Sequence, residues 1–189
     1  GRRTPAGSTE DARVTNRPTP HFGLLLPNDG YPVVDFDHLR TLAREAEALD
    51  FDSAWVADHF LAPPGLSAAF GTKGIFEATL VLAALSSVTE RIALGTSVLL
   101  FPMRHPIHLA NLISTLDHAT KGRLILGFGV GGHRPEFDAC GVPYAKRGGM
   151  TNEALEILNA LFTQDNVSYE GKHYQFENVS FEPKPYTPG

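Results

Sequence analysis

The chain has 189 residues, of which 42% are hydrophobic and 20% charged, proportions typical of a globular protein that buries a core. Its formal net charge is -5 and it has no basic run, so it offers no electrostatic footprint for nucleic acid or for an anionic membrane surface. No apolar stretch is long enough to cross a bilayer, because even residues 81–100 are interrupted by Thr89, Glu90 and Arg91. Neither nucleic acid nor a membrane is therefore an expected partner.

The single cysteine, Cys140, excludes an internal disulfide and a cysteine-based metal site, and it suits a reducing cytoplasm. We expect its side chain to be a small buried apolar group. Residues 1–20 carry few large apolar side chains and cannot offset the entropy of ordering by burial. They are predicted to form a disordered tail before a folded domain at residues 21–189.

From residue 21 onward, short apolar runs alternate with longer amphipathic stretches, the pattern of βα units around a parallel sheet. Residues 22–26 are predicted as the first strand. Asp35 is placed to N-cap a helix that Asp50 closes. The apolar residues of this helix recur at helical spacing: Phe36, Leu39, Leu42, Ala43, Ala46 and Leu49.

The second predicted strand covers residues 53–57, and a loop at residues 63–74 leads to a helix near residues 76–88. The apolar stripe expected for this helix consists of Leu80, Ala84, Leu85 and Val88. Residues 92–99 are apolar and rich in β-branched side chains, which predicts a third strand buried on both faces.

The next helix is expected to start at Pro106 and to end at Gly122. Its inward-facing residues are expected to be Ile107, Ala110, Ile113 and Leu116. A fourth strand is predicted at residues 124–128, followed by a glycine-rich loop and a helix around residues 152–162. Residues 167–181 then have the pattern of a small antiparallel excursion.

Four βα units in one direction are half of an eight-stranded barrel, which needs about 250 residues. An open half-barrel would expose strand edges and core to water. The sequence therefore predicts an α/β fold, a TIM barrel with about its first four βα units present and truncated at the C-terminus. Because the strand edges would be exposed, a homo-oligomer is a possible partner arrangement. A doubly wound nucleotide-binding sheet is the alternative, but residues 26–30 lack its glycine spacing.

In a parallel barrel, catalytic groups project from the C-terminal ends of strands. Asp58 and His59 follow the second predicted strand, where an imidazole can give or take a proton beside a carboxylate. Position alone supports catalysis and a structural loop contact about equally for His59. His105 and His108 have no carboxylate in their local motif, so no metal site is predicted.

Several segments together carry a resemblance to a known family. They are residues 43–55 (AREAEALDFDSAW), Asp58 with His59, 90–99 (ERIALGTSVL), 102–106 (PMRHP), 122–129 (GRLILGFG), 144–148 and 167–185. With these motifs the chain resembles the luciferase-like oxidoreductases, the family of bacterial luciferase, whose members use FMN or the deazaflavin F420. The resemblance spans residues 21–189.

The resemblance implies a cofactor site at the strand ends. In F420-dependent members, the segment matching Thr96, Ser97 and Val98 forms a bulge behind the central ring, with a non-prolyl cis peptide that here would join Ser97 to Val98. The histidine matching His59 acts as proton donor or acceptor beside a hydride transfer, and the aspartate matching Asp58 contacts the ring system. The loop that passes near the ring edge implies cofactor-binding roles for Gly129, Gly131 and Gly132.

The chain departs from the family at one catalytic position. Some sugar-oxidising F420 enzymes carry a carboxylate where this chain has Gly132, so that acid/base pair is not transferred; Glu136 lies nearby but is expected to begin a helix. The resemblance favours an enzyme in which F420 exchanges hydride with a small organic substrate. The alternatives are an FMN-dependent monooxygenase acting with molecular oxygen and an inactive cofactor-binding fragment.

Overall fold

The computed structural model describes residues 20–61 and 73–187. Nearly all of the predicted tail at residues 1–20 and most of the predicted loop at residues 63–74 lie outside the described residues. In chain order the elements are β1 (Gly23–Leu25), α1 (Phe36–Ala48), β2 (Ser53–Val56), α3 (Ala78–Ser86), β3 (Ala93–Leu100), η1 (Phe101–Met103), α4 (Pro106–Thr120), β4 (Leu124–Gly129), α5 (Arg134–Ala139), η2 (Tyr144–Lys146), α6 (Arg147–Thr163), β5 (Asn166–Glu170) and β6 (Gln175–Ser180).

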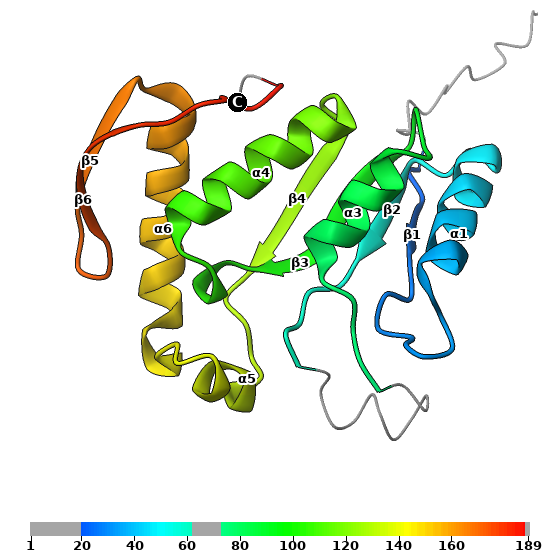
Figure 1. The fold of residues 1–189 in the computed structure, drawn as a ribbon, viewed down its shortest axis with the longest axis horizontal. Helices are drawn as coiled ribbons and strands as arrows, with labels where there is room; N and C mark the ends of the chain where they lie inside the picture. The colour runs from blue at the N-terminus through cyan, green and yellow to red at the C-terminus, as the bar shows by residue number, and fades with distance from the viewer. Residues whose placement is uncertain (1–19, 62–72, 188–189) are drawn as a thin grey trace, which may run out of the picture.

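The first four strands form one parallel sheet in the order β1-β2-β3-β4. Figure 1 shows α1, α3 and α4 on the same face of this sheet. The predicted α/β pattern of successive βα units is therefore confirmed. Because the strands are parallel, their carboxyl ends meet at one edge of the sheet, which brings together the loops after β2, β3 and β4.

The predicted helix ends agree closely with the structure where a capping residue marks them. The Asp35 side chain caps α1 by accepting a hydrogen bond from His38 N at 2.9 Å, and Asp50, just beyond the helix, has φ 57°. The helix α4 begins at Pro106, and Lys121 and Gly122 end it with φ 55° and 79°. Short polar, proline and glycine signals thus set these boundaries.

The predicted apolar stripes are partly wrong. In α3 the buried apolar residues are Ala78, Val81, Leu82 and Leu85, whereas Leu80 is 65% exposed. The reason is that α3 is apolar nearly all round, so its sequence alone does not distinguish the inward face; positions 78, 81, 82 and 85 pack inward, and residue 80 faces outward. In α1, Leu42 and Leu49 are likewise exposed, and Leu49 is the residue that follows the last turn.

Two further burial predictions are corrected. The strand β3 is not buried along its whole length, because its register with β4 shifts between Thr96 and Leu99, and Ser97 and Val98 are exposed there. Cys140 is exposed rather than buried, since it follows the short surface helix α5 as its C-cap.

Two clusters of buried apolar side chains form the core. The first lies between α1, α3 and the strands β2 and β3, and includes Leu39, Val56, Leu82 and Leu94. The second lies between α4, α6 and the end of β3, and includes Leu99, Leu109, Ile157 and Leu161. The elements β3 and α4 contribute to both clusters, so the core is continuous along them.

The predicted antiparallel excursion is confirmed as the hairpin β5–β6, which lies against α6 (Figure 1). The Glu153 carboxylate of α6 accepts hydrogen bonds from the backbone amides of Lys172, His173 and Tyr174, which holds the hairpin turn on the helix. Among the helices of the described ranges, none combines the length and apolar character needed to cross a membrane.

Candidate active site

The loop after β2 is fixed at its start by Asn28, which is fully buried after β1. Its Nδ2 donates to the carbonyl oxygens of Ala57 at 2.8 Å and Phe76 at 2.9 Å, and its Oδ1 accepts from Ala57 N at 3.0 Å. Since a buried amide that makes all these bonds leaves little freedom to its partners, the backbone just before Asp58 is held in place.

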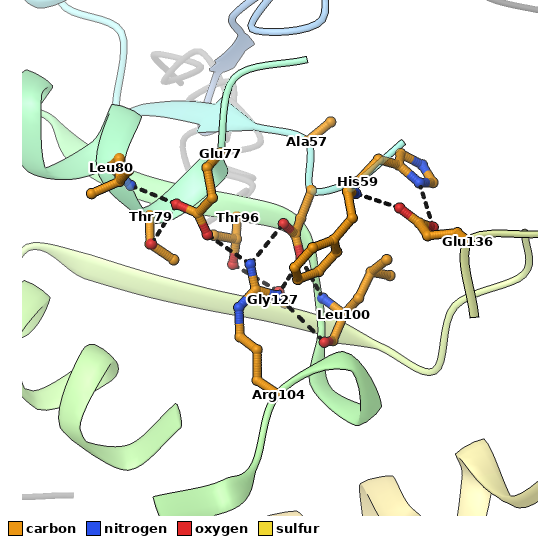
Figure 2. A network of polar contacts seen from close by, with 12 residues as sticks. Ala57, His59, Glu77, Thr79, Leu80, Thr96, Leu100, Arg104, Gly127 and Glu136 are labelled. Atoms are coloured by element: carbon orange, nitrogen blue, oxygen red, sulfur yellow. Dashed lines mark hydrogen bonds and ion pairs between the residues drawn. The ribbon is translucent and has the colours of Figure 1, made fainter. Parts of the chain in front are cut away.

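Asp58 lies inside the fold and pairs with Arg104. Its carboxylate accepts from Arg104 Nη1 at 2.7 Å, from Arg104 Nη2 at 3.0 Å and from Leu100 N at 2.8 Å, and its side chain is 1% exposed. Arg104 also donates to Glu77 Oε1 at 2.7 Å and lies over the Phe60 ring, 4.8 Å from its centre. Figure 2 shows Arg104 reaching into this network. This bidentate ion pair, together with the bond from Leu100 N, connects the segment after β2 to the end of β3 and the segment that follows it.

The ion pair between Arg104 and Glu77 shifts the pKa of both groups. Burial alone would lower the pKa of Arg104, but its bonds to Asp58 and Glu77 outweigh burial and raise that pKa above its ordinary value. Burial would raise the pKa of Glu77, but hydrogen bonds from Thr79, Leu80 and Arg104 outweigh it and keep the pKa below its ordinary value. The Asp58 carboxylate accepts its hydrogen bonds from Arg104 and Leu100, which are donors within the protein.

His59 contacts a carboxylate that sequence reasoning missed. Its Nδ1 lies 3.2 Å from Glu136 Oε2, and the same carboxylate accepts hydrogen bonds from the amides of Phe60 and Leu61 through Oε1. Figure 2 shows Glu136 facing the His59 ring. Glu136 is 0% exposed, whereas the His59 side chain is 29% exposed, so the imidazole has one edge on protein and one toward solvent.

Glu136 does lie in a helix, as expected, at the third position of α5. Its contact with His59 joins residues 77 apart in sequence. The parallel strand pattern could have indicated this contact, because the segments that follow parallel strands lie at the same edge of the sheet, and residue 136 follows β4 as residue 59 follows β2.

The end of β3 forms the bulge that the family resemblance implies. Register with β4 shifts between Thr96 and Leu99, and the peptide bond between Ser97 and Val98 is cis, so both expectations are confirmed. Thr96 is buried, and its Oγ1 donates to Gly127 O at 2.7 Å. Val98 is 41% exposed at the carboxyl edge of the sheet.

The glycines at the end of β4 and in the loop after it allow close approach. A Cβ at Gly129 would lie 2.7 Å from Val98 Cγ2, and one at Gly131, where φ is 76°, would lie 2.7 Å from the Phe137 ring. A Cβ at Gly132 would meet nothing within 4 Å. Arg147 Nε donates to Gly131 O at 3.1 Å and holds the loop from the other side. Gly129 and Gly131 are thus required by packing, whereas Gly132 borders open space.

These contacts bring most of the predicted site residues to one place. Asp58 touches the end of β3, Gly129 packs on Val98, and His59 meets the segment after β4 through Glu136. Beside them lies a hollow of about 130 Å³, lined by Asp58, His59, Phe60, Ile75 and Glu77. Ligand pockets usually measure about 300–1,000 Å³, so this hollow could take only part of a ligand.

The arrangement suits a flat, partly apolar ring system. Val98 offers an exposed apolar surface, Gly132 leaves room for a ligand against the backbone, and the partly exposed imidazole of His59 can donate or accept a proton. These residues fit a flavin or deazaflavin ring, and the buried pair of Asp58 and Arg104 holds the strand ends on which they stand.

Comparison with known proteins agrees with this fold. The family model described as luciferase-like monooxygenase matches residues 20–188. An uncharacterised protein of Mycobacterium tuberculosis is 35% identical over 180 residues, which cover 89% of this chain and 62% of the relative. The FMNH(2)-dependent dimethylsulfone monooxygenase of Pseudomonas putida is 30% identical over 154 residues, or 80% of this chain and 40% of that enzyme.

Solved structures share the fold. The monooxygenase RslO1 of Streptomyces bottropensis has a TM-score of 0.78 and 25% identity over 88% of this chain and 50% of its own. The coenzyme F420-dependent tetrahydromethanopterin reductase of Methanopyrus kandleri has a TM-score of 0.71 and 24% identity over 89% of this chain and 47% of the reductase. The chain spans less than two thirds of the length of these proteins. Since the family model matches nearly the whole chain, the chain belongs to the luciferase-like monooxygenase family.

Proposed function

We propose that this chain forms part of an oxidoreductase in which F420 exchanges hydride with a small organic substrate, and that His59 is its proton donor or acceptor. The observation that carries the proposal is the His59 imidazole, partly exposed at the strand ends and held from behind by a fully buried carboxylate. F420, when bound, accepts or supplies the hydride, and the protein contributes orientation, proton transfer and exclusion of water.

The residues of the proposed cofactor site have two roles: some would contact the cofactor ring, and others would hold those residues in position. Ser97, Val98 and the loop from Gly129 to Gly132 would contact the ring, because they are exposed or lack side chains at the edge where His59 lies. Thr96 and Asp58 would act as positioning residues, since their polar side-chain atoms bond to Gly127, Arg104 and Leu100 inside the fold.

We also propose that the four-stranded sheet belongs to an eight-stranded barrel, within one domain that includes residues 21–189. The proposal is supported by the likeness of the chain to half of the RslO1 structure, and by Leu25 and Ile125, apolar residues of β1 and β4 that are 60% and 42% exposed on the sheet.

An FMN-dependent monooxygenase is the second candidate, and the dimethylsulfone monooxygenase relative, at 30% identity, favours it. Both candidates need a flat ring at the strand ends, but only the second needs reaction with oxygen. An inactive cofactor-binding fragment is the third candidate.

The test titrates the protein with F420 and with FMN and follows binding by fluorescence. Tight F420 binding is expected; FMN binding without F420 binding would overturn the first candidate, and cofactor binding without any turnover would leave the third. In a turnover assay with the cofactor that binds, His59→Ala should lower kcat by about 100-fold or more, the usual contribution of a positioned acid or base, and the titration should show little change in the cofactor Kd. His38→Ala, on the exposed side of α1, is the matched control. An unchanged kcat would remove His59 from the mechanism.

A further inference from the structure

Glu136 is surrounded by hydrogen-bond donors. Its Oε1 accepts from the backbone amides of Phe60 and Leu61, the latter at 3.1 Å, and its Oε2 lies 3.2 Å from His59 Nδ1. Backbone amides can only donate, so Oε1 is an acceptor in every state of the protein. With Glu136 fully buried, its remaining oxygen is satisfied by the imidazole.

This arrangement fixes the hydrogen on the imidazole. With Glu136 in its carboxylate form, Oε2 accepts, and Nδ1 of His59 then carries the N–H. A neutral imidazole has one N–H, so its second nitrogen, Nε2, has a free lone pair. When the ring takes up a proton, that proton goes to Nε2.

We propose that Glu136 is a positioning residue that holds His59 in its Nδ1–H form and so makes Nε2 the atom that exchanges protons in the reaction. The inference deepens the proposed function and rests on it for the proton exchange. The tautomer itself rests only on the contacts of Glu136. Buried carboxylates that orient a histidine in this way act through the imidazole and not on the substrate.

A purely structural role would make a different prediction for glutamine. In Glu136→Gln, the amide oxygen can still accept from Phe60 N and Leu61 N, so the loop keeps both bonds. The side-chain NH₂ then faces His59 Nδ1. Two backbone amides cannot become acceptors, whereas an imidazole can move its hydrogen, so the ring is expected to change to the Nε2–H form.

The experiment is nitrogen-detected NMR of the histidine rings in ¹⁵N-labelled protein, at a pH where the ring is neutral. The His59 signals are assigned by their loss in His59→Gln. Wild type is expected to show Nδ1–H, and Glu136→Gln is expected to show Nε2–H with backbone amide signals otherwise retained. A wild-type ring in the Nε2–H form would overturn the proposal, even if the variant fails to fold.

Glu47→Gln is the matched control. Glu47 also accepts hydrogen bonds from three successive backbone amides, those of Glu90, Arg91 and Ile92, but the loop it holds precedes β3 rather than following β2. It should leave the His59 signals unchanged. A wild-type tautomer retained in Glu136→Gln would also overturn the proposal.

Turnover separates this inference from the proposed function. If both hold, Glu136→Gln lowers kcat by about 100-fold or more, as the wrong tautomer does in other buried carboxylate–histidine pairs, with little change in KM. A change of tautomer without loss of turnover would overturn the role of Nε2. If His59→Ala also leaves kcat unchanged, the proposed function fails, while the NMR result still decides whether Glu136 sets the tautomer.

Discussion

At the scale of single residues, the buried charges of Asp58 and Arg104 matter most for the shape of the site. Arg104→Met is expected to destabilise the protein by about 3–5 kcal/mol, because it leaves the 1% exposed Asp58 carboxylate without its cation. Urea unfolding measures the loss. The control, Arg40→Met, removes an exposed ion pair with Asp37 and should cost little. Equal costs for the two variants would contradict a structural role for the buried pair.

The sequence could place some of these residues but not their partners. The position of Asp58 and His59 after β2 follows from the strand pattern, which is local. The partners Arg104 and Glu136 lie 46 and 77 residues further on, and no local pattern pairs residues at that distance. Glu136 was expected only to begin a helix, and the burial of its side chain against the loop after β2 does not follow from a helical pattern.

At the scale of elements, the start of α3 links stability to pH. The Glu77 carboxylate caps α3 and binds Arg104, and these hydrogen bonds outweigh its burial and hold its pKa below the ordinary 4.5. A group whose pKa is lower in the folded state stabilises the fold above its unfolded pKa, and this stabilisation is lost as the pH falls through the folded pKa.

Glu77→Gln is therefore expected to cost about 1 kcal/mol at neutral pH, and the difference from wild type should shrink as the pH falls below 4.5. Urea unfolding at pH 7 and at several values below 4.5 measures the difference. Glu45→Gln, on the exposed side of α1, should show no such pH-dependent cost. A cost for Glu77→Gln that grows on acidification would contradict this account.

The ends of the helices were easier to predict from the sequence than the helix faces that pack against the core. Asp35, Pro106 and Gly122 mark ends by their own backbone chemistry, so α1 and α4 were placed to within about two residues. The inward face of α3 depends on how the helix packs on the sheet, because the helix carries apolar residues on nearly all sides. Leu80 was therefore assigned to the wrong side, since two different apolar faces of α3 have helical spacing.

At the scale of the whole molecule, the two clusters of the core share two continuous elements. The strand β3 carries Leu94 in the first cluster and Leu99 in the second, and α4 carries Leu116 in the first and Leu109 in the second. Because β3 and α4 each carry side chains of both clusters, loss of packing in one cluster also removes contacts that hold the other cluster together. The described part of the chain should therefore unfold as one cooperative unit.

Leu161→Ala tests this cooperativity. Leu161 is fully buried in the second cluster, and its truncation is expected to cost about 2–5 kcal/mol. Trp55, the single tryptophan of the chain, lies on β2, whose neighbours Ala54 and Val56 belong to the first cluster. Its fluorescence therefore reports unfolding of the part of the core that the substitution does not touch.

In urea, Leu161→Ala should lower the midpoint seen by Trp55 fluorescence as much as the midpoint seen by circular dichroism. Leu80→Ala, at a leucine that is 65% exposed, should move neither midpoint appreciably. If the Trp55 midpoint stays at its wild-type value while the circular dichroism midpoint falls, the clusters unfold separately. The His59 loop on β2 and the Glu136 segment after β4 would then not be held together by one folding unit.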